Sequence, residues 1–139
     1  MNKALLDTDI FSEISKGVNQ NVAAKATTYH AVYGYYTLSA ITVLEIVKGF
    51  HKVQREDRIQ NFLAVLPTIE LLTLDRHSAE LAGRIYADLE RTGQPIGRAD
   101  PMIAAIALQN RLTLVTGNLA HYQRIPNLGY SLNLENWRL

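Results

Sequence analysis

The sequence of 139 residues contains no cysteine and carries a net charge of only +1. Without cysteine, neither a disulfide framework nor a thiolate zinc site can form, which fits a reducing compartment. Without a large positive charge, any surface that binds nucleic acid must be local. The composition, 47% hydrophobic and 19% charged, is typical of a folded globular domain.

Long apolar segments are also missing. No apolar run approaches the roughly 18 residues of a membrane-spanning helix, and residues 1–7 lack the apolar region of a signal peptide. We find no internal repeat, low-complexity tract or linker. We therefore expect a single domain over residues 1–139, located in the cytoplasm and without a membrane partner.

Short apolar segments alternate with helical patterns along the chain. Strands are expected at residues 4–6, 36–40, 69–74 and 112–115, with a last one near 130–132. Helices are expected from Thr8 or Asp9 to Gly17, from Thr42 to a bend or an end at Gly49, and over 55–66, 75–91 and 100–108, whereas 19–34 is ambiguous and can be helical at 22–26. Alternating strands and helices require crossovers. We therefore predict an α/β fold with a central, mainly parallel sheet of four to five strands flanked by helices.

Three acidic residues occupy comparable positions in this pattern. Asp7 follows the first strand, Glu45 lies near the start of the helix after the second strand, and Asp100 begins the apolar helix that leads to the fourth. Ligands in α/β folds bind at the carboxyl ends of the strands, which meet at one edge of a parallel sheet. We therefore expect the three carboxylates to converge there, with Asn118 joining them from the end of the fourth strand.

Each of these acids also has a purely structural explanation. Asp7 can cap the first helix, Glu45 completes a capping box with Thr42, and Asp100 is placed to cap the apolar helix. Asp9 is better explained as a cap or a supporting residue than as a ligand. What favours a functional site is the joint placement of three acids at one edge, since capping adequately explains any one of them.

Carboxylates held together repel each other and raise each other's pKa, and a bound cation relieves that repulsion. A set of oxygen ligands without cysteine favours a hard ion, Mg²⁺ or Mn²⁺. Such a site can position a phosphodiester, activate water and stabilise charge on the attacking and leaving oxygens. The residues therefore predict metal-assisted hydrolysis or transfer at a phosphate.

With these residues placed, the chain resembles the PIN-domain ribonucleases, specifically the VapC-type toxins of toxin–antitoxin pairs. The resemblance rests on the order of several segments over nearly the whole chain rather than on one motif. These segments are LLDTD at 5–9, Leu44-Glu45 with Gly49, PIG at 95–97, DPMIAA at 100–105, LVTGN at 114–118 and LENW at 134–137.

The resemblance implies a PIN fold and an Mg²⁺- or Mn²⁺-dependent endoribonuclease. Asp7 and Asp100 would be the main metal ligands, and Glu45 would bind the ion directly or through water. It also implies a homodimer or a larger toxin–antitoxin assembly, with a cognate VapB-type antitoxin that fills the acidic groove. Transfer, ribosomal and messenger RNA all remain open as substrates.

One segment departs from the family pattern. Many members carry a further acid after the fourth strand, where this chain has the neutral Asn118 and then His121. Asn118 can still bind a water or a phosphate, and His121 can contact the scissile phosphate or simply lie at the surface. The missing acid weakens the case for two metals and motivates an alternative, a catalytically silent PIN-fold module that acts through protein binding. A phospho-acceptor receiver domain would require a late lysine, but the last one is Lys52.

Basic and aromatic clusters each allow two explanations. Three basic residues and a histidine share a helical spacing and can hold RNA phosphates or form a solvated face: Lys48, Lys52, Arg55 and His51. Arg98 can serve the substrate or an acidic antitoxin segment, or neutralise Asp100. Four tyrosines can stack bases, although packing in the core or a dimer interface is the more frequent use of such residues: Tyr29, Tyr33, Tyr35 and Tyr36.

Overall fold

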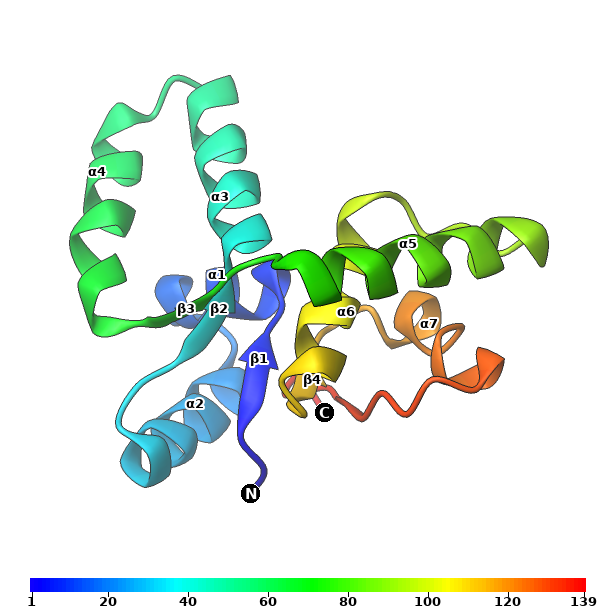
Figure 1. The fold of residues 1–139 in the computed structure, drawn as a ribbon. Helices are drawn as coiled ribbons and strands as arrows, with labels where there is room; N and C mark the ends of the chain where they lie inside the picture. The colour runs from blue at the N-terminus through cyan, green and yellow to red at the C-terminus, as the bar shows by residue number, and fades with distance from the viewer.

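Five short strands, all paired in parallel, form the centre of the computed structural model, which describes residues 1–139 (Figure 1). They are β1 (Ala4–Leu6), β2 (Thr37–Ser39), β3 (Glu70–Leu72), β4 (Thr113–Val115) and β5 (Leu134–Glu135). The strands form two hydrogen-bonded ladders, β1–β4–β5 and β2–β3. The predicted α/β class, with five parallel strands flanked by helices, is confirmed, although hydrogen bonds divide the strands into sets of three and two rather than joining them in one sheet.

A tyrosine hydroxyl explains part of the separation between the two ladders. The Tyr29 hydroxyl accepts from the Ala4 amide at 3.0 Å and donates to the Ala4 carbonyl at 3.3 Å. Both backbone groups of Ala4 are thus bonded to a side chain rather than to a neighbouring strand. Strand β2 nevertheless packs beside β1, so the elements that follow the two strands still meet.

The prediction of a last strand near residues 130–132 is wrong, because the paired residues are Leu134–Glu135. The first residue of β5 pairs with Leu114 of β4. The preceding segment serves as a connection in which the Tyr130 hydroxyl donates to Asp88 at 2.6 Å. Apolar residues alternate through both segments, so alternation alone did not distinguish the strand from the connection.

Seven α-helices and two 3₁₀ turns connect the strands. They are α1 (Thr8–Lys16), α2 (Gln20–Tyr33), α3 (Ala40–Lys52), α4 (Glu56–Val65), η1 (Leu66–Thr68), α5 (Arg76–Arg91), α6 (Ala99–Gln109), α7 (Leu119–Tyr122) and η2 (Pro126–Leu128). Several predicted boundaries are confirmed: α1 ends at Gly17 with a φ of 67°, and Asp75 caps α5. The ambiguous segment forms one helix, α2, which Asn19 caps.

Helix α3 begins two residues earlier than predicted. Ser39 is its cap, and the serine hydroxyl accepts from the Thr42 amide at 3.1 Å. The predicted capping box of Thr42 and Glu45 is therefore wrong, and Glu45 lies in the second turn. The helix also continues through Gly49 without ending there. Capping thus no longer explains Glu45.

Helix α6 also lacks the predicted cap. Arg98 occupies the cap position without a side-chain hydrogen bond, and Asp100 lies inside the first turn. An acid there still favours the helix through its dipole. Because the Asp100 carboxylate does not cap the helix, it is free for a contact elsewhere.

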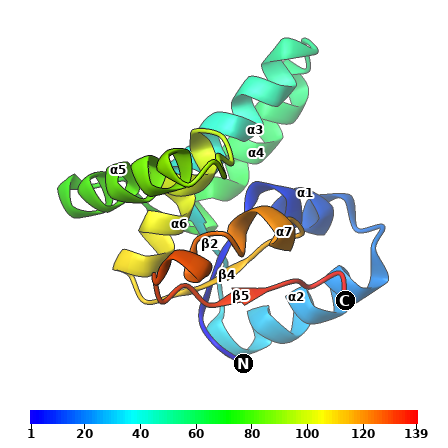
Figure 2. The same ribbon diagram turned by 90° about the vertical axis from the view of Figure 1, so that its right-hand side faces the viewer.

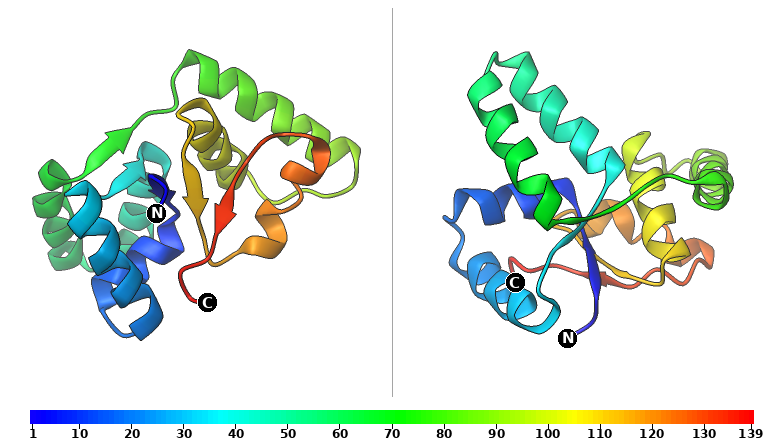
Figure 3. Two further views of the ribbon diagram at one scale, coloured as in Figure 1. Left: turned by 90° about the horizontal axis from the view of Figure 1, so that it is seen from below. Right: turned by 60° about the vertical axis from the view of Figure 1, so that its left-hand side comes forward.

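The helices surround the strands unevenly (Figures 1, 2 and 3). Helix α5 packs against α6, while α3 and α4 form a hairpin that projects away from the strands (Figures 1 and 3). The C-terminal residues run beside α2 (Figure 2). There Asn21 donates to the carbonyl of Arg138 at 3.0 Å, and Lys25 donates to that of Leu139 at 2.6 Å. The C-terminus is therefore tied to the first half of the chain.

The core is divided between the two faces of the strands. Because side chains alternate along a strand, Leu5 and Leu114 join one cluster with α5 and α6, whereas Leu6 and Val115 join another with α1 and α2. Helix α6 is deeply buried, as predicted. None of the helices is both long and apolar enough to cross a membrane.

The tyrosine cluster packs into the structure. Tyr29 is completely buried, and its ring centroid lies 4.6 Å from that of Tyr33, 6.1 Å from that of Tyr36 and 5.6 Å from that of Trp137. The prediction that packing explains these tyrosines is confirmed for these three. Tyr35 instead lies near a cation, the Lys3 amine, at 5.3 Å from its ring.

Removing the Tyr29 hydroxyl tests its role at the edge of β1. We expect Tyr29→Phe to lower the free energy of unfolding by about 1–3 kcal/mol, because two buried backbone groups of Ala4 lose their partner. The matched control is Tyr33→Phe, whose hydroxyl donates to the exposed Met1 carbonyl, where water can replace it. Urea unfolding followed by circular dichroism measures both variants. Equal losses would contradict the role assigned to Tyr29.

Candidate active site

Asp7 stands between β1 and α1 and is only 7% exposed. It is itself the cap of α1, in place of Thr8 or Asp9: its Oδ1 accepts from the Thr8 amide at 2.9 Å. Its Oδ2 accepts from the Thr116 hydroxyl at 2.8 Å, beyond the end of β4. Burial, and then the charge of Asp9, raise the pKa of Asp7 to about 7 against the opposing effect of these hydrogen bonds.

Glu45 is held by a residue next to Asp7. The Thr8 hydroxyl lies 2.7 Å from Glu45 Oε1 and 3.0 Å from the Thr42 hydroxyl. Thr8 therefore connects the start of α1 to the second turn of α3. Its amide bonds Asp7, and its hydroxyl bonds Glu45. This contact brings Glu45 to the end of β1.

Asp100 reaches the same region from the first turn of α6. Its Oδ1 accepts from the hydroxyl of the buried Tyr122 at 3.0 Å. Burial first, and the charges of Glu45 and Asp9, raise the pKa of Asp100, while the hydrogen bond from Tyr122 and the nearby His121 lower it. Asp100 is thus close enough to Glu45 to respond to its charge.

Asp100 therefore lies within range of the charges of both other predicted acids. Asp100 contributes to the raised pKa of Asp7, and Glu45 contributes to that of Asp100. Segments that are far apart in the sequence supply the three acids, namely the end of β1, the second turn of α3 and the first turn of α6. The structure thus brings the three acids together, while their roles in catalysis and metal binding stay predictions.

Asn118 faces a different partner. Its amide donates to the Thr116 hydroxyl oxygen at 3.0 Å, and its side-chain nitrogen lies 2.9 Å from Nδ1 of His121. The two residues that depart from the family pattern therefore pair with each other. No hydrogen bond joins the Asn118 side chain to any of the three carboxylates.

Asp9 is engaged as a supporting residue. Its Oδ1 accepts from the Ile10 amide at 2.7 Å, and its Oδ2 accepts from the Gly117 amide at 3.0 Å. The guanidinium of Arg138 lies 3.5 Å from the same oxygen and bonds Glu13 through Nε at 3.0 Å. Both oxygens of Asp9 are thus occupied, which agrees with its predicted supporting role.

Sequence reasoning missed four side chains that hold these acids: Thr8, Thr116, Tyr122 and Arg138. Thr116 carried a usable signal, since a hydroxyl residue directly after a buried strand lies at the same edge as Asp7. Arg138 carried none, because the acids that its guanidinium contacts are at least 125 positions away.

The donor set suits a hard divalent ion. The structure contains no group of three or more acidic or histidine side chains already arranged around one point. Mg²⁺, however, is commonly held by only one or two carboxylates together with waters and substrate phosphates. Two mutually repelling carboxylates, Asp7 and Asp100, therefore fit such an ion in their chemistry.

The basic residues that the sequence suggested for RNA binding differ in their contacts. Arg55 forms a two-point contact with Asp57, at 3.0 and 2.9 Å. Lys48 and Lys52 are exposed on α3 and form no ion pair, as expected of a solvated face. Arg98 is exposed two residues before Asp100 and does not form an ion pair with it.

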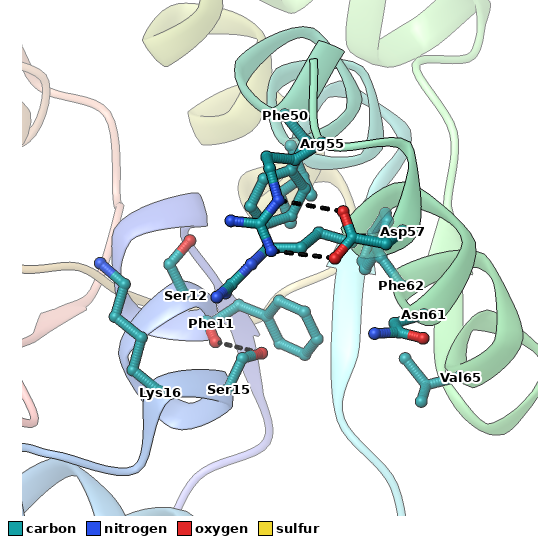
Figure 4. Close-up of a pocket in the computed structure, with 12 residues that line it drawn as sticks. Phe11, Ser12, Ser15, Lys16, Phe50, Arg55, Asp57, Asn61, Phe62 and Val65 are labelled. Atoms are coloured by element: carbon teal, nitrogen blue, oxygen red, sulfur yellow. Dashed lines mark hydrogen bonds and ion pairs between the residues drawn. The ribbon is translucent and has the colours of Figure 1, made fainter. Parts of the chain in front are cut away.

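A hollow of about 620 Å³ lies between α1 and the α3–α4 hairpin (Figure 4). Its apolar lining consists of Phe11, Ile46, Phe50, Phe62 and Val65. Its polar lining contains one acid, which Arg55 neutralises, and two cations that form no ion pair, Lys16 and Arg58. We call this hollow the basic-rimmed groove. None of the four predicted site residues lines it.

A parallel α/β core whose strands end at a cluster of carboxylates defines the general class of this protein. A comparison with models of protein families identifies the family: the model of the PIN domain matches residues 4–126. The chain belongs to the PIN-domain family, and the predicted PIN fold is confirmed.

The relatives within that family are VapC proteins. A tRNA(fMet)-specific endonuclease VapC of Shigella flexneri is 30% identical, over 99% of both chains. The Salmonella typhimurium protein of the same name is 35% identical over 72% of this chain and 74% of its own. Among solved structures, the DNA-bound VapBC complex of Salmonella typhimurium contains a chain that is 29% identical, with a TM-score of 0.81 over 99% of both chains.

The close approach of Arg138 makes residue 117 sensitive to any side chain. A Cβ on Gly117 would collide with the guanidinium of Arg138 and lie 2.6 Å from Oδ2 of Asp9. We expect Gly117→Ala to lower the free energy of unfolding by roughly 1–3 kcal/mol. In an Arg138→Ala background the loss should be smaller but not absent, because Asp9 remains.

A four-member double-mutant cycle measured by urea unfolding checks this coupling. The matched control is Gly49→Ala on α3, where a Cβ would meet nothing within 4 Å. There the better helix propensity of alanine should leave stability unchanged or raise it by about 0.5–1 kcal/mol. Identical losses at Gly117 in both backgrounds would show that Arg138 does not restrict that residue.

Proposed function

We propose that this chain is a divalent-metal-dependent endoribonuclease and the toxin of a toxin–antitoxin pair. One observation carries the proposal: in a chain of the PIN-domain family, Thr8 bonds both Asp7 and Glu45, and Asp100 lies within range of the charges of both. The names of its relatives, which are ribonucleases and endonucleases, support RNA as the substrate.

In the proposed site, Asp7 and Asp100 hold the ion, Mg²⁺ or Mn²⁺, and Glu45 contributes directly or through water. When bound, the ion supplies positive charge for the phosphate and lowers the pKa of an attacking water. The chain's own residues orient the site: Thr116 holds one oxygen of Asp7, and Thr8 holds one oxygen of Glu45. In this proposal, His121 contacts a substrate phosphate.

Transfer RNA is the substrate to test first. Two relatives are named tRNA(fMet)-specific endonucleases, and one of them aligns with 99% of this chain. The net charge of +1 indicates that cations local to the site, rather than the whole surface, would hold the RNA. The exposed Lys48, Lys52 and Arg98 are the candidates.

The partner we propose is a VapB-type antitoxin, because the solved neighbours are VapBC complexes. The basic-rimmed groove suits an apolar segment that carries acidic residues. Its floor presents three phenylalanine rings, two of which, Phe11 and Phe62, meet edge to face at 5.9 Å. Lys16 and Arg58 at its rim have no acidic partner within the chain. A homodimer and a cytoplasmic location complete the proposal.

A catalytically silent module is the second candidate, and one observation favours it. Asn118 and His121 pair with each other where many family members carry an acid. Such a module would bind the antitoxin but not a metal. Calorimetric titration with Mn²⁺ distinguishes the two, since binding to the wild-type chain would exclude the silent module and its absence would favour it.

Neutralising Asp7 tests the enzyme. We expect Asp7→Asn to reduce RNA cleavage roughly 100-fold or more, because loss even of outer partners of metal ligands costs 10–100-fold. EDTA should abolish wild-type cleavage, and Mg²⁺ should restore it. The matched control is Asp75→Asn, which retains a good cap on α5 and lies outside the acidic cluster. Cleavage that survives both EDTA and Asp7→Asn would rule the mechanism out.

Reversing charge at the rim tests the groove. We expect Lys16→Glu with Arg58→Glu to slow association with the antitoxin encoded beside this chain's gene, because rim charges act mainly on the association rate. The rate should also lose most of its dependence on salt. Arg84→Glu with Arg91→Glu, at two exposed arginines of α5, is the control with the same change of net charge. Surface plasmon resonance at two ionic strengths measures the rates, and unchanged kinetics would place the partner elsewhere.

A further inference from the structure

The segment after β4 contains a buried tyrosine whose hydroxyl has a single partner. Tyr122 ends α7, is completely buried, and donates through its hydroxyl to Asp100 Oδ1 at 3.0 Å. Its ring belongs to the core cluster that also contains Ile103 and Ile125. A phenylalanine would suit these apolar surroundings without a polar group to satisfy. Packing alone therefore does not explain the hydroxyl.

The hydrogen bond restricts the Asp100 carboxylate. An ionised carboxylate can only accept hydrogen bonds, so the phenol must be the donor. The contact from Tyr122 is the one hydrogen bond that Asp100 makes through its side chain, and it engages Oδ1 alone. Oδ2 is therefore the oxygen left for another ligand.

The same segment also reaches Asp7. The Tyr122 amide donates to the Asn118 carbonyl at 3.2 Å, and the Asn118 amide donates to the Thr116 hydroxyl oxygen at 3.0 Å. That hydroxyl in turn donates to Asp7 Oδ2 at 2.8 Å. Hydrogen bonds of the short segment 116–122 therefore link the Asp7 carboxylate to the Asp100 carboxylate.

We infer that Tyr122 is a positioning residue for the metal site, holding Oδ1 of Asp100 so that Oδ2 remains for a divalent cation. The inference rests on the proposed function, because it takes Asp100 as a metal ligand. Groups that hydrogen-bond a metal ligand fix its orientation, and their loss typically weakens metal binding or activity by about 10–100-fold. The Thr116 hydroxyl holds Asp7 in the corresponding way, from the other end of the same segment.

Removing one oxygen atom tests the inference. In Tyr122→Phe, we expect the dissociation constant for Mn²⁺, measured by calorimetry without RNA, to rise about 10–100-fold. In RNA cleavage, kcat at a fixed low Mn²⁺ concentration should fall and recover as Mn²⁺ is raised, while KM for RNA stays near the wild-type value. A purely structural role would not produce recovery by metal.

The chain offers a matched control in Tyr130→Phe. That change also removes a phenol that donates to an aspartate, Asp88, at 2.6 Å, but neither residue belongs to the acidic cluster. Thermal unfolding of both variants shows whether they fold. We expect Tyr130→Phe to bind Mn²⁺ like the wild type, whatever its effect on stability.

The outcomes separate this inference from the proposed function. If the wild-type chain neither binds Mn²⁺ nor cleaves RNA, the proposed function fails. If the wild type binds Mn²⁺ and a folded Tyr122→Phe binds it equally well, the positioning role alone is overturned. Should Tyr122→Phe fail to fold, Thr116→Val compared with Thr116→Ser asks the same question of the other end of the segment. Equal Mn²⁺ affinities in that pair would likewise overturn the inference.

Discussion

The burial of carboxylates at one end of the strands is the constraint on which the rest of this structure depends. Asp7, Glu45 and Asp100 come from three separate segments, and burial raises the pKa of Asp7 and of Asp100. Each of the three accepts a hydrogen bond from the hydroxyl of a different residue. In each case that residue lies at least 22 positions away from the acid in the sequence. Hydroxyl groups fix the direction of a carboxylate without cancelling its charge.

The fold supplies these hydroxyl groups at the ends of its strands. Thr116 directly follows β4, Thr8 begins α1 two residues after β1 ends, and Tyr122 closes the short helix α7. Parallel pairing of β1 with β4 places Thr116 beside Asp7, because Leu6 pairs with Val115 in the preceding register position. The packing of the sheet therefore determines which donor meets which acid.

The sequence predicted this arrangement where local rules govern it. The order of strands and helices, the parallel pairing and the placement of Asp7 and Asp100 followed from strand ends and helix starts. Local capping rules failed at Glu45 and Asp100 for one reason, which is that each helix begins earlier than the local pattern indicates, at Ala40 and at Ala99. Glu45 and Asp100 therefore lie inside their helices, where they contact Thr8 and Tyr122.

Contacts between residues far apart in the chain lay beyond such rules. The division of the strands into two ladders involves Tyr29 and Ala4, which are 25 positions apart. The position of Arg138 depends on Glu13, at the opposite end of the chain. No spacing or periodicity within a short window encodes either contact, whereas both become evident once the strands are paired.

Positive charge is distributed unevenly among the acidic residues at and beside the site. Arg138 compensates Asp9 and Glu13, next to the cluster, at 3.5 and 3.0 Å. None of the ion pairs in the structure involves Asp7, Glu45 or Asp100. The protein thus neutralises the acids that support the site and leaves the three at its centre without a cation of their own. Selective neutralisation of this kind separates Asp9 from its neighbour Asp7, two residues away, and it supports a role for the three remaining charges in holding a cation from solution.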